Sequence, residues 1–226
     1  MAFLLLTAYA PDYLNKTVLL VAVLGFYVGF VEFKEQVSLD ILRDDIVPVA
    51  EKIRESGSDH GAVLSFDAVG IGTPTSDEMP ALASHPVVWA PHQRVFPGIS
   101  SEENLERYFT FIFLQGRDES WLRDALIRNE AAVVHGVFGW GRGEGEVLGG
   151  KAPIRLEEID EMTARYHDFE SSFNESSAAK YPVTFVVVHE LAKDSVDVFD
   201  RYYEREFIGK YKKYLLFRAR LRTNVS

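Results

Sequence analysis

The chain has 226 residues, 47% hydrophobic and 26% charged, a composition typical of globular proteins and a length sufficient for one domain with a sizeable core. It contains no cysteine, which excludes disulfides, thiolate metal sites and cysteine nucleophiles. The formal net charge is -10, but residues 201–222 hold eight Lys or Arg against two Glu, a local +6 that leaves -16 on the rest. This acidic body excludes a general nucleic-acid-binding protein, because neutralising phosphates requires a basic surface.

The first 33 residues are the most hydrophobic part of the chain. They contain three charged residues, and residues 17–31 form an unbroken uncharged run. As a helix this run measures about 22 Å, against a hydrocarbon core of roughly 30 Å. The run is apolar on every face and aromatic residues mark its ends. This favours the end of one membrane helix over residues 2–10, a tight polar turn, and the next membrane helix over residues 17–33.

Two alternatives stay open for this segment. The sequence Ala8-Tyr9-Ala10 is compatible with signal-peptide cleavage, although no basic region precedes the apolar stretch. The segment is also compatible with a buried core helix or a pair of strands in a soluble protein. We expect residues 1–35 to be a hydrophobic membrane segment of one or two helices, and residues 36–226 to be a soluble domain.

Beyond residue 35 the chain alternates between helical and strand patterns, with one loop rich in Gly, Pro and Thr. In chain order the predicted ranges are 46–57 (helix), 61–67 (strand), 68–80 (loop), 85–91 (strand), 102–116 (helix), 118–130 (helix), 131–139 (strand), 155–173 (helix), 181–190 (strand), 194–205 (helix) and 213–222 (strand). This alternation predicts an α/β fold with a mostly parallel sheet flanked by helices and an antiparallel last strand.

The stretch before residue 153 contains part of a phosphate-binding motif. Gly145, Gly150 and Lys151 stand at the spacing of G-x-x-x-x-G-K, in which glycine amides and the lysine hold phosphates. The hydroxyl residue that would bind Mg²⁺ is replaced by Ala152, and Pro153 removes an amide where the helix should begin. We therefore interpret the stretch as a solvated loop.

A second fragment, His189-Glu190, matches the start of the zinc motif H-E-x-x-H. The second histidine position is Lys193, and the pair leaves a predicted strand, whereas the motif needs both histidines on one helix face. Because both motifs are incomplete, neither indicates a metal site, a cofactor site or a catalytic residue.

The stretch ASHPVVWAPHQRVFPG, residues 83–98, concentrates aromatic, imidazole and guanidinium groups among prolines, and a Glu-Arg pair follows in the next helix. On a loop after a strand, such groups are suited to a sugar or an anionic headgroup. The alternative is a rigid loop packed under neighbouring helices, with the Glu-Arg pair bonded internally. The candidate ligand-binding residues are His85, Trp89, His92, Arg94, Glu106 and Arg107.

The last predicted strand has two different faces. One face is apolar and the other carries three arginines and a leucine, in the sets Leu215, Phe217, Ala219, Leu221 and Leu216, Arg218, Arg220, Arg222. A terminal edge strand with a charged outer face resists pairing with other chains. Contact with anionic lipid near a membrane is the functional alternative.

The order of these segments resembles the C-terminal region of large bacterial polytopic membrane proteins, either uncharacterised or grouped with GT-C glycosyltransferases and oligosaccharyltransferases. The resemblance lies in TVLLVAVLGFYVGFVEF, VLSFD, SHPVVWAPHQRVF with SSEENLERYF, YPVTFVVVHE and YLLFRARL. It implies a membrane-anchored accessory portion. In that superfamily the catalytic acidic residues lie in loops near the start of the membrane region. Nothing here corresponds to them, so no catalytic residue is carried over.

The sequence thus predicts a membrane-anchored, non-catalytic accessory α/β domain of a glycosyltransferase-like membrane protein, facing the extracytoplasmic side. Its expected partners are the lipid bilayer and a lipid-linked sugar or anionic lipid, without nucleic acid or cofactor. One alternative is a freestanding soluble enzyme or binding protein for a small polar or glycosylated ligand, acting through the region from His85 to Arg107. The other alternative is a pure interaction module.

Overall fold

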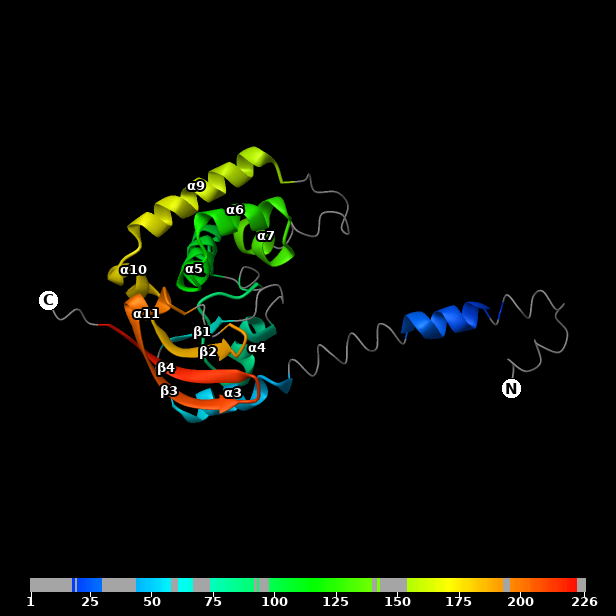
Figure 1. Cartoon of the computed structure of the whole chain (residues 1–226), viewed down its shortest axis with the longest axis horizontal. Coiled ribbons are helices and arrows are strands. Elements are labelled where there is room, and N and C mark those ends of the chain that lie inside the picture. Colours follow the sequence, from blue (N-terminus) through cyan, green and yellow to red (C-terminus); the bar gives the residue numbers. More distant parts are fainter. Residues whose placement is uncertain are drawn as a thin grey trace. The chain divides into compact units, whose positions relative to one another are not determined.

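The structure is a computed structural model, and it describes residues 18, 20–29, 44–57, 61–66, 74–91, 93, 98–139, 142, 154–192 and 196–222. The chain divides into two units, Met1–Asp44 and Asp45–Ser226. In the first unit residues 20–29 are helical. The second unit, called the folded unit below, contains a sheet with helices on both faces (Figure 1). The predicted membrane helix over residues 2–10 and most of the Gly-rich stretch lie outside the described residues.

The sheet has four strands in the order β1-β2-β4-β3. Their bounds are Ala62–Phe66 (β1), Val183–His189 (β2), Tyr203–Tyr211 (β3) and Tyr214–Leu221 (β4). Strands β1 and β2 are parallel, whereas β4 is antiparallel to both β2 and β3. The prediction of an α/β fold is confirmed, but the sheet is mixed and its described strands include one parallel pair. The reason is the two-residue turn after β3, which forces the next strand to run back beside it.

Helices cover the two faces of the sheet unequally (Figure 1). On one face, α3 (Val47–Glu55) and α4 (Pro74–Ala83) enclose a small core with Val63, Phe185 and Leu216. The larger core lies on the other face, under α5 (Ser101–Leu114), α6 (Glu119–Ile127), α7 (Ala131–Phe138) and α9 (Leu156–Ser172), with α10 (Glu175–Lys180) and α11 (Phe199–Tyr202) at its margin. Both cores form because side chains along β1 and β2 alternate between the faces.

Local signals in the sequence account for several of these elements. Helix α5 begins where Ser100 Oγ accepts a hydrogen bond from the amide of Glu103 at 3.0 Å. Asp118 caps α6 in the same way, through the amide of Trp121 at 2.8 Å. The predicted helices that became α3, α5, α6 and α9 are confirmed, as are the strands β1, β2 and β4 and the antiparallel direction of β4.

The pattern of residues 131–139 predicts a strand, but these residues form helix α7. Val133, Val134 and Val137 are buried and share one helical face, so the helix buries the same apolar residues that a strand would bury. The chain leaves the helix at Gly139, whose φ of 85° suits glycine. A short run of β-branched residues therefore does not by itself predict a strand, because it can form a helix when neighbouring helices supply its packing partners.

The prediction is also wrong over residues 194–205 and in part around residues 74–91. Among the described residues of this range only Phe199–Tyr202 is helical, because Tyr203–Tyr211 forms β3 and pairs with β4. Helix α4 occupies part of the predicted loop, and the strand predicted over residues 85–91 is reduced to a single parallel bridge between Val63 and Val87. Prolines on both sides of this bridge lack the amide that a longer ladder needs.

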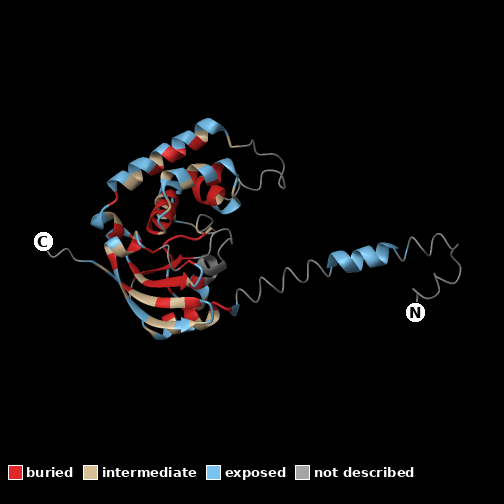
Figure 2. Cartoon of the chain, in the orientation of Figure 1, coloured by how far each residue is buried: buried red, intermediate tan, exposed pale blue. Residues whose placement is uncertain are grey.

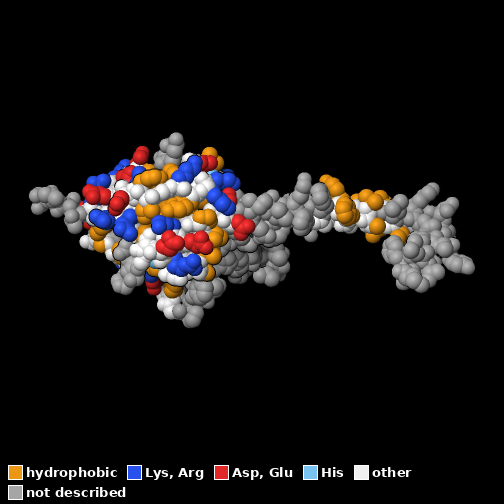
Figure 3. Space-filling model, turned by 90° about the horizontal axis from the view of Figure 1, so that it is seen from below, with side chains coloured by type: hydrophobic (Ala, Val, Ile, Leu, Met, Phe, Trp, Pro, Cys, Tyr) orange, Lys and Arg blue, Asp and Glu red, His pale blue; other side chains and the backbone are white. Residues whose placement is uncertain are grey.

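The basic last strand lies inside the sheet, between β2 and β3, so it is not the edge strand that its charge pattern indicates. The edge is β3, which carries alternating charges and a bulge between Phe207 and Gly209. The face shown in Figure 3 mixes Lys and Arg with Asp and Glu around a band of hydrophobic side chains. Charges and a bulge both hinder edge-to-edge pairing, so the protection predicted for β4 is supplied by β3.

We predict that Gly136→Ala destabilises the folded unit by about 2–3 kcal/mol, a typical cost of overpacking a core. A methyl group at Gly136 would overlap three ring atoms of Tyr108, which is 2% exposed and cannot move aside. Thermal unfolding of the full chain in mild detergent measures the effect. Ala132→Ser, at an exposed position of the same helix, is the control and should change little. An equal loss in a Tyr108→Leu background would show that the ring is not the cause.

We predict that Asp45→Asn lowers stability at pH 7 by about 1.5–3 kcal/mol, the scale of a hydrogen bond to a charged group. Asp45 is 8% exposed, and its carboxylate lies 2.9 Å from Lys212 Nζ and 3.3 Å from Lys213 Nζ. The hydrogen bond from Lys212 holds the pKa of Asp45 below its ordinary value. The stabilisation is therefore complete above the ordinary aspartate pKa and is lost as the pH falls through the lower folded value. Melting curves of both proteins should converge toward pH 2, and a difference that persists there would contradict the prediction.

Candidate functional site

His85 lies in the core between the sheet and helices α3 and α4. The residue is 7% exposed, and its ring packs edge-on against Phe185 with 5.4 Å between centroids. Its Nδ1 lies 3.0 Å from the carbonyl oxygen of Ala83. Because a carbonyl only accepts, Nδ1 carries the proton and donates it. The Nε2 atom has no hydrogen-bond partner among the described residues. The first candidate is thus a core side chain with one buried polar atom that has no partner among the described residues.

Trp89 lies in the larger core, on the opposite face of the sheet from the Phe185 ring. It is 4% exposed and packs against two residues of α5, with ring centroids 4.7 Å from Tyr108 and 5.3 Å from Phe111. Its Nε1 has no acceptor in the described part of the chain. The indole therefore contributes mainly packing area, and it fixes the 87–90 segment onto α5.

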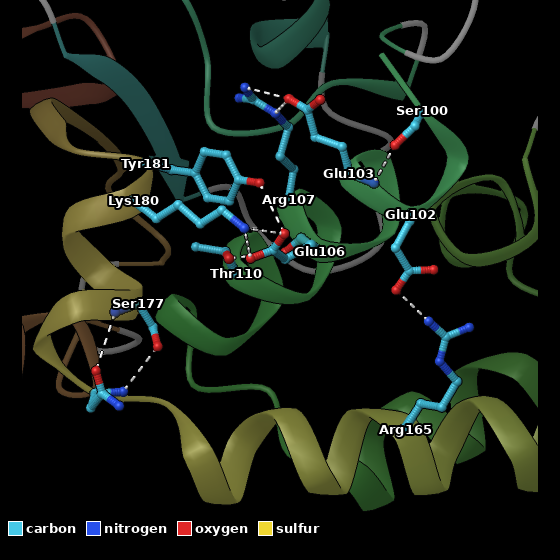
Figure 4. Close-up of polar contacts among 11 residues, drawn as sticks. Ser100, Glu102, Glu103, Glu106, Arg107, Thr110, Arg165, Ser177, Lys180 and Tyr181 are labelled. Carbon is cyan, nitrogen blue, oxygen red and sulfur yellow. Dashed lines mark hydrogen bonds and ion pairs between the residues drawn. The ribbon is translucent and has the colours of Figure 1, made fainter.

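Glu106 and Arg107 project from α5 toward the end of α10 (Figure 4). Lys180 Nζ lies 2.5 and 2.6 Å from the two carboxylate oxygens of Glu106, and the hydroxyl of Tyr181 donates to the same carboxylate at 3.2 Å. Arg107 bonds to Glu103 at 2.9 Å and lies 4.4 Å from the centroid of the Tyr181 ring. Both candidates therefore have partners within the protein, and the group joins two helices.

The electrostatics of this group agree with a structural role. The hydrogen bond to Glu106 raises the pKa of Lys180, so its ammonium form is favoured. Burial raises the pKa of Tyr181, and the nearby Glu106 carboxylate adds to this effect. Both shifts favour the protonated forms, so Lys180 is an ammonium group and Tyr181 a neutral phenol near pH 7.

The four described candidates thus occupy three different environments. His85 and Trp89 lie in separate cores, while Glu106 and Arg107 face α10. His92 and Arg94 lie outside the described residues. The partners of Glu106 are more than 70 residues away in the chain, so no local pattern in the sequence predicts these contacts. Only the packing of α5 against the segment after α10 brings them together.

The helix over residues 20–29 differs from every other helix that the structure describes. Its large apolar side chains, together with Val18, are between 41% and 77% exposed: Val18, Leu20, Val21, Val23, Leu24, Phe26, Tyr27 and Val28. Figure 2 shows the described residues of this helix as exposed on all sides. No helix within the described residues has both the length and the apolar character needed to cross a membrane.

No group of three His, Asp or Glu side chains with metal-binding geometry occurs in the part of the chain that the structure describes. Comparisons of the chain with protein-family models, with curated proteins and with solved structures give no match.

Proposed function

We propose that this protein is a membrane-anchored, non-catalytic α/β domain, with residues 1–35 as its attachment to the bilayer. The observation that carries the proposal is the exposed apolar helix over residues 20–29. Leaving a large apolar side chain in water costs about 1.5–3 kcal/mol relative to burying it. Eight such side chains around one short helix are a strong driving force toward an apolar environment.

Lipid is the environment that this helix fits best. A helix that packs on a globular partner normally has one apolar stripe and one polar face, whereas a helix that is apolar all round is surrounded by lipid or by protein core. Residues 18–29 contain no charged or strongly polar side chain. The sequence extends the uncharged run to residues 17–31, and Glu32 then marks the return to polar composition.

The accessory role and the extracytoplasmic location rest on the resemblance to GT-C-like membrane proteins. On that basis the folded unit would support a larger catalytic assembly and contact a lipid-linked sugar or another lipid. The internal pairing of Glu106 and Arg107 is consistent with a non-catalytic unit, because these side chains are already engaged.

The test is membrane partition of the full chain. The protein is expressed, the cells are fractionated, and the membranes are washed with alkaline carbonate. Resistance to extraction is the expected result, because the wash removes proteins held by polar contacts and leaves those held in lipid. A chain that is recovered in the soluble fraction before the wash would overturn the proposal.

One observation favours a second candidate, a binding protein for a small polar or glycosylated ligand. The Nε1 donor of Trp89 and the Oδ1 acceptor of Asn104 are both buried and lack partners among the described residues. Trp89 packs against Tyr108, and Asn104 lies one helical turn before Tyr108 on α5. A hydroxyl group, which both donates and accepts, could satisfy either atom. Melting of the full chain with a panel of simple sugars tests this function, and a stabilisation absent from Trp89→Phe would support it.

A further inference from the structure

The folded unit begins beside the turn between β3 and β4. Asp45 is its first residue, and the Asp45 carboxylate is held by the ammonium groups of Lys212 and Lys213 in that turn. Figure 1 shows the turn next to the start of α3. The chain that comes from the N-terminal unit therefore joins the folded unit at this turn. In a chain attached to a bilayer through residues 1–35, the covalent connection to that attachment enters the folded unit beside this turn.

The surface around the turn has the composition of a membrane interface. We call it the lysine rim, and it comprises Lys210, Lys212, Lys213 and Leu191. The lysine side chains are 46–55% exposed, and Leu191 is 78% exposed, the most exposed large apolar residue described in the folded unit. The loop of Leu191 adjoins the turn, because the amide of Glu190 donates to the carbonyl of Lys213 at 2.8 Å. Lysines and exposed apolar side chains in one place are typical of surfaces that lie on headgroups.

The charges of the lysine rim point to phospholipid rather than to nucleic acid. The three ammonium groups of the rim face the carboxylates of Asp45 and Glu190, and Asp44 adds another acidic residue, so the rim and these neighbours together have little net charge. Nucleic-acid binding requires a clear positive excess. The exposed ion pair of Lys210 with Glu190 is weak, so the Lys210 ammonium group can exchange a carboxylate for a lipid phosphate at little cost. An ammonium group has three donors, so Lys212 and Lys213 can donate to lipid phosphates while they keep their contacts with Asp45.

We propose that the lysine rim rests on the phospholipid headgroups of the same bilayer that holds residues 1–35. Leu191 inserts between headgroups, and the three lysines donate hydrogen bonds to lipid phosphates. The helical layer with α9 then points away from the bilayer, since it lies across the sheet from β3 (Figure 1). This inference rests on the proposed membrane attachment and adds an orientation of the folded unit to it.

The absence of cysteine allows a clean test with a single label. The full chain carrying Leu191→Cys is labelled with bimane and reconstituted into phosphatidylcholine vesicles that contain a headgroup-attached nitroxide lipid. Ala164→Cys, at an exposed position of α9, is the matched control. We expect the nitroxide lipid to quench the label at position 191 several-fold more strongly than the label at position 164. Equal quenching at both positions would overturn the proposal.

A second measurement uses the unmodified full chain. Lysines are acetylated in vesicles and in detergent micelles, and the modified sites are counted by mass spectrometry. We expect Lys210, Lys212 and Lys213 to lose reactivity in vesicles while Lys180 reacts equally in both. Protection by an added oligonucleotide instead of the vesicles would overturn the proposal.

The failure of the two proposals can be distinguished. A chain that resists carbonate extraction but shows no protection of the rim lysines would support the membrane attachment and contradict only the proposed orientation. A chain that does not associate with vesicles at all overturns both.

Discussion

Replacing Val21 and Leu24 together by lysine is expected to move the full chain from the carbonate-resistant membrane fraction into the soluble fraction. At the centre of a membrane helix, lysine costs about 2.5–3.5 kcal/mol whereas leucine or valine contributes about 0.3–0.6 kcal/mol of stabilisation. Two such exchanges therefore change the insertion free energy by roughly 6–8 kcal/mol, more than a short helix can absorb. Both side chains are more than half exposed, so the substitutions should not disturb protein packing in the described structure.

The matched control for this double variant exchanges the same two residues, as Val21→Leu with Leu24→Val. It keeps the volume and the apolar character of the helix, and it should partition like the original chain. The melting temperature of the folded unit should be the same in both variants. A lysine variant that remains carbonate-resistant would show that residues 20–29 do not hold the chain in the membrane.

Trp89→Ala is expected to destabilise the folded unit by about 3–5 kcal/mol, the usual cost of truncating a buried tryptophan. The indole fills the space between the 87–90 segment and α5, in contact with Tyr108 and Phe111. Its removal leaves a cavity that the surrounding rings cannot close, because they are fixed by α7 and by the sheet. Thermal unfolding of the full chain in mild detergent measures the loss.

Trp89→Phe separates packing from hydrogen bonding at the same position. Phenylalanine keeps most of the ring contacts and removes only the Nε1 donor, which has no acceptor among the described residues. We expect this variant to lose less than half as much stability as Trp89→Ala. A loss as large as that of alanine would indicate that the Nε1 donor is bonded to a water or ligand.

Segments with strong local signals were predictable from the sequence. Ser100 and Asp118 mark the starts of α5 and α6, because each cap forms between residues only three apart in the chain. The β-branched run of β2 is equally clear, since a strand buried on both faces needs such residues throughout. The candidate site was less predictable. Glu106 and Arg107 are identifiable as a charged pair, but their partners Lys180 and Tyr181 are distant in sequence.

Other features depended on contacts between segments far apart in the chain. Residues 131–139 and 203–211 have similar numbers of β-branched or aromatic residues, yet the first segment packs as α7 and the second pairs with β4 as β3. The parallel or antiparallel direction of a strand depends on which neighbour completes its backbone hydrogen bonds, and no residue within the strand encodes that choice.

The sequence by itself determined the hydrophobic N-terminal segment, the α/β class and the capped helices, because these follow from composition and from interactions within a few residues. The tertiary structure alone decided that the sheet is mixed, that β4 lies inside it and that His85 and Trp89 lie in separate cores. It also placed Lys212 and Lys213 beside Asp45, the first residue of the folded unit. These features arise from pairing and packing across long stretches of chain, where the free energy of contacts overrides local preference.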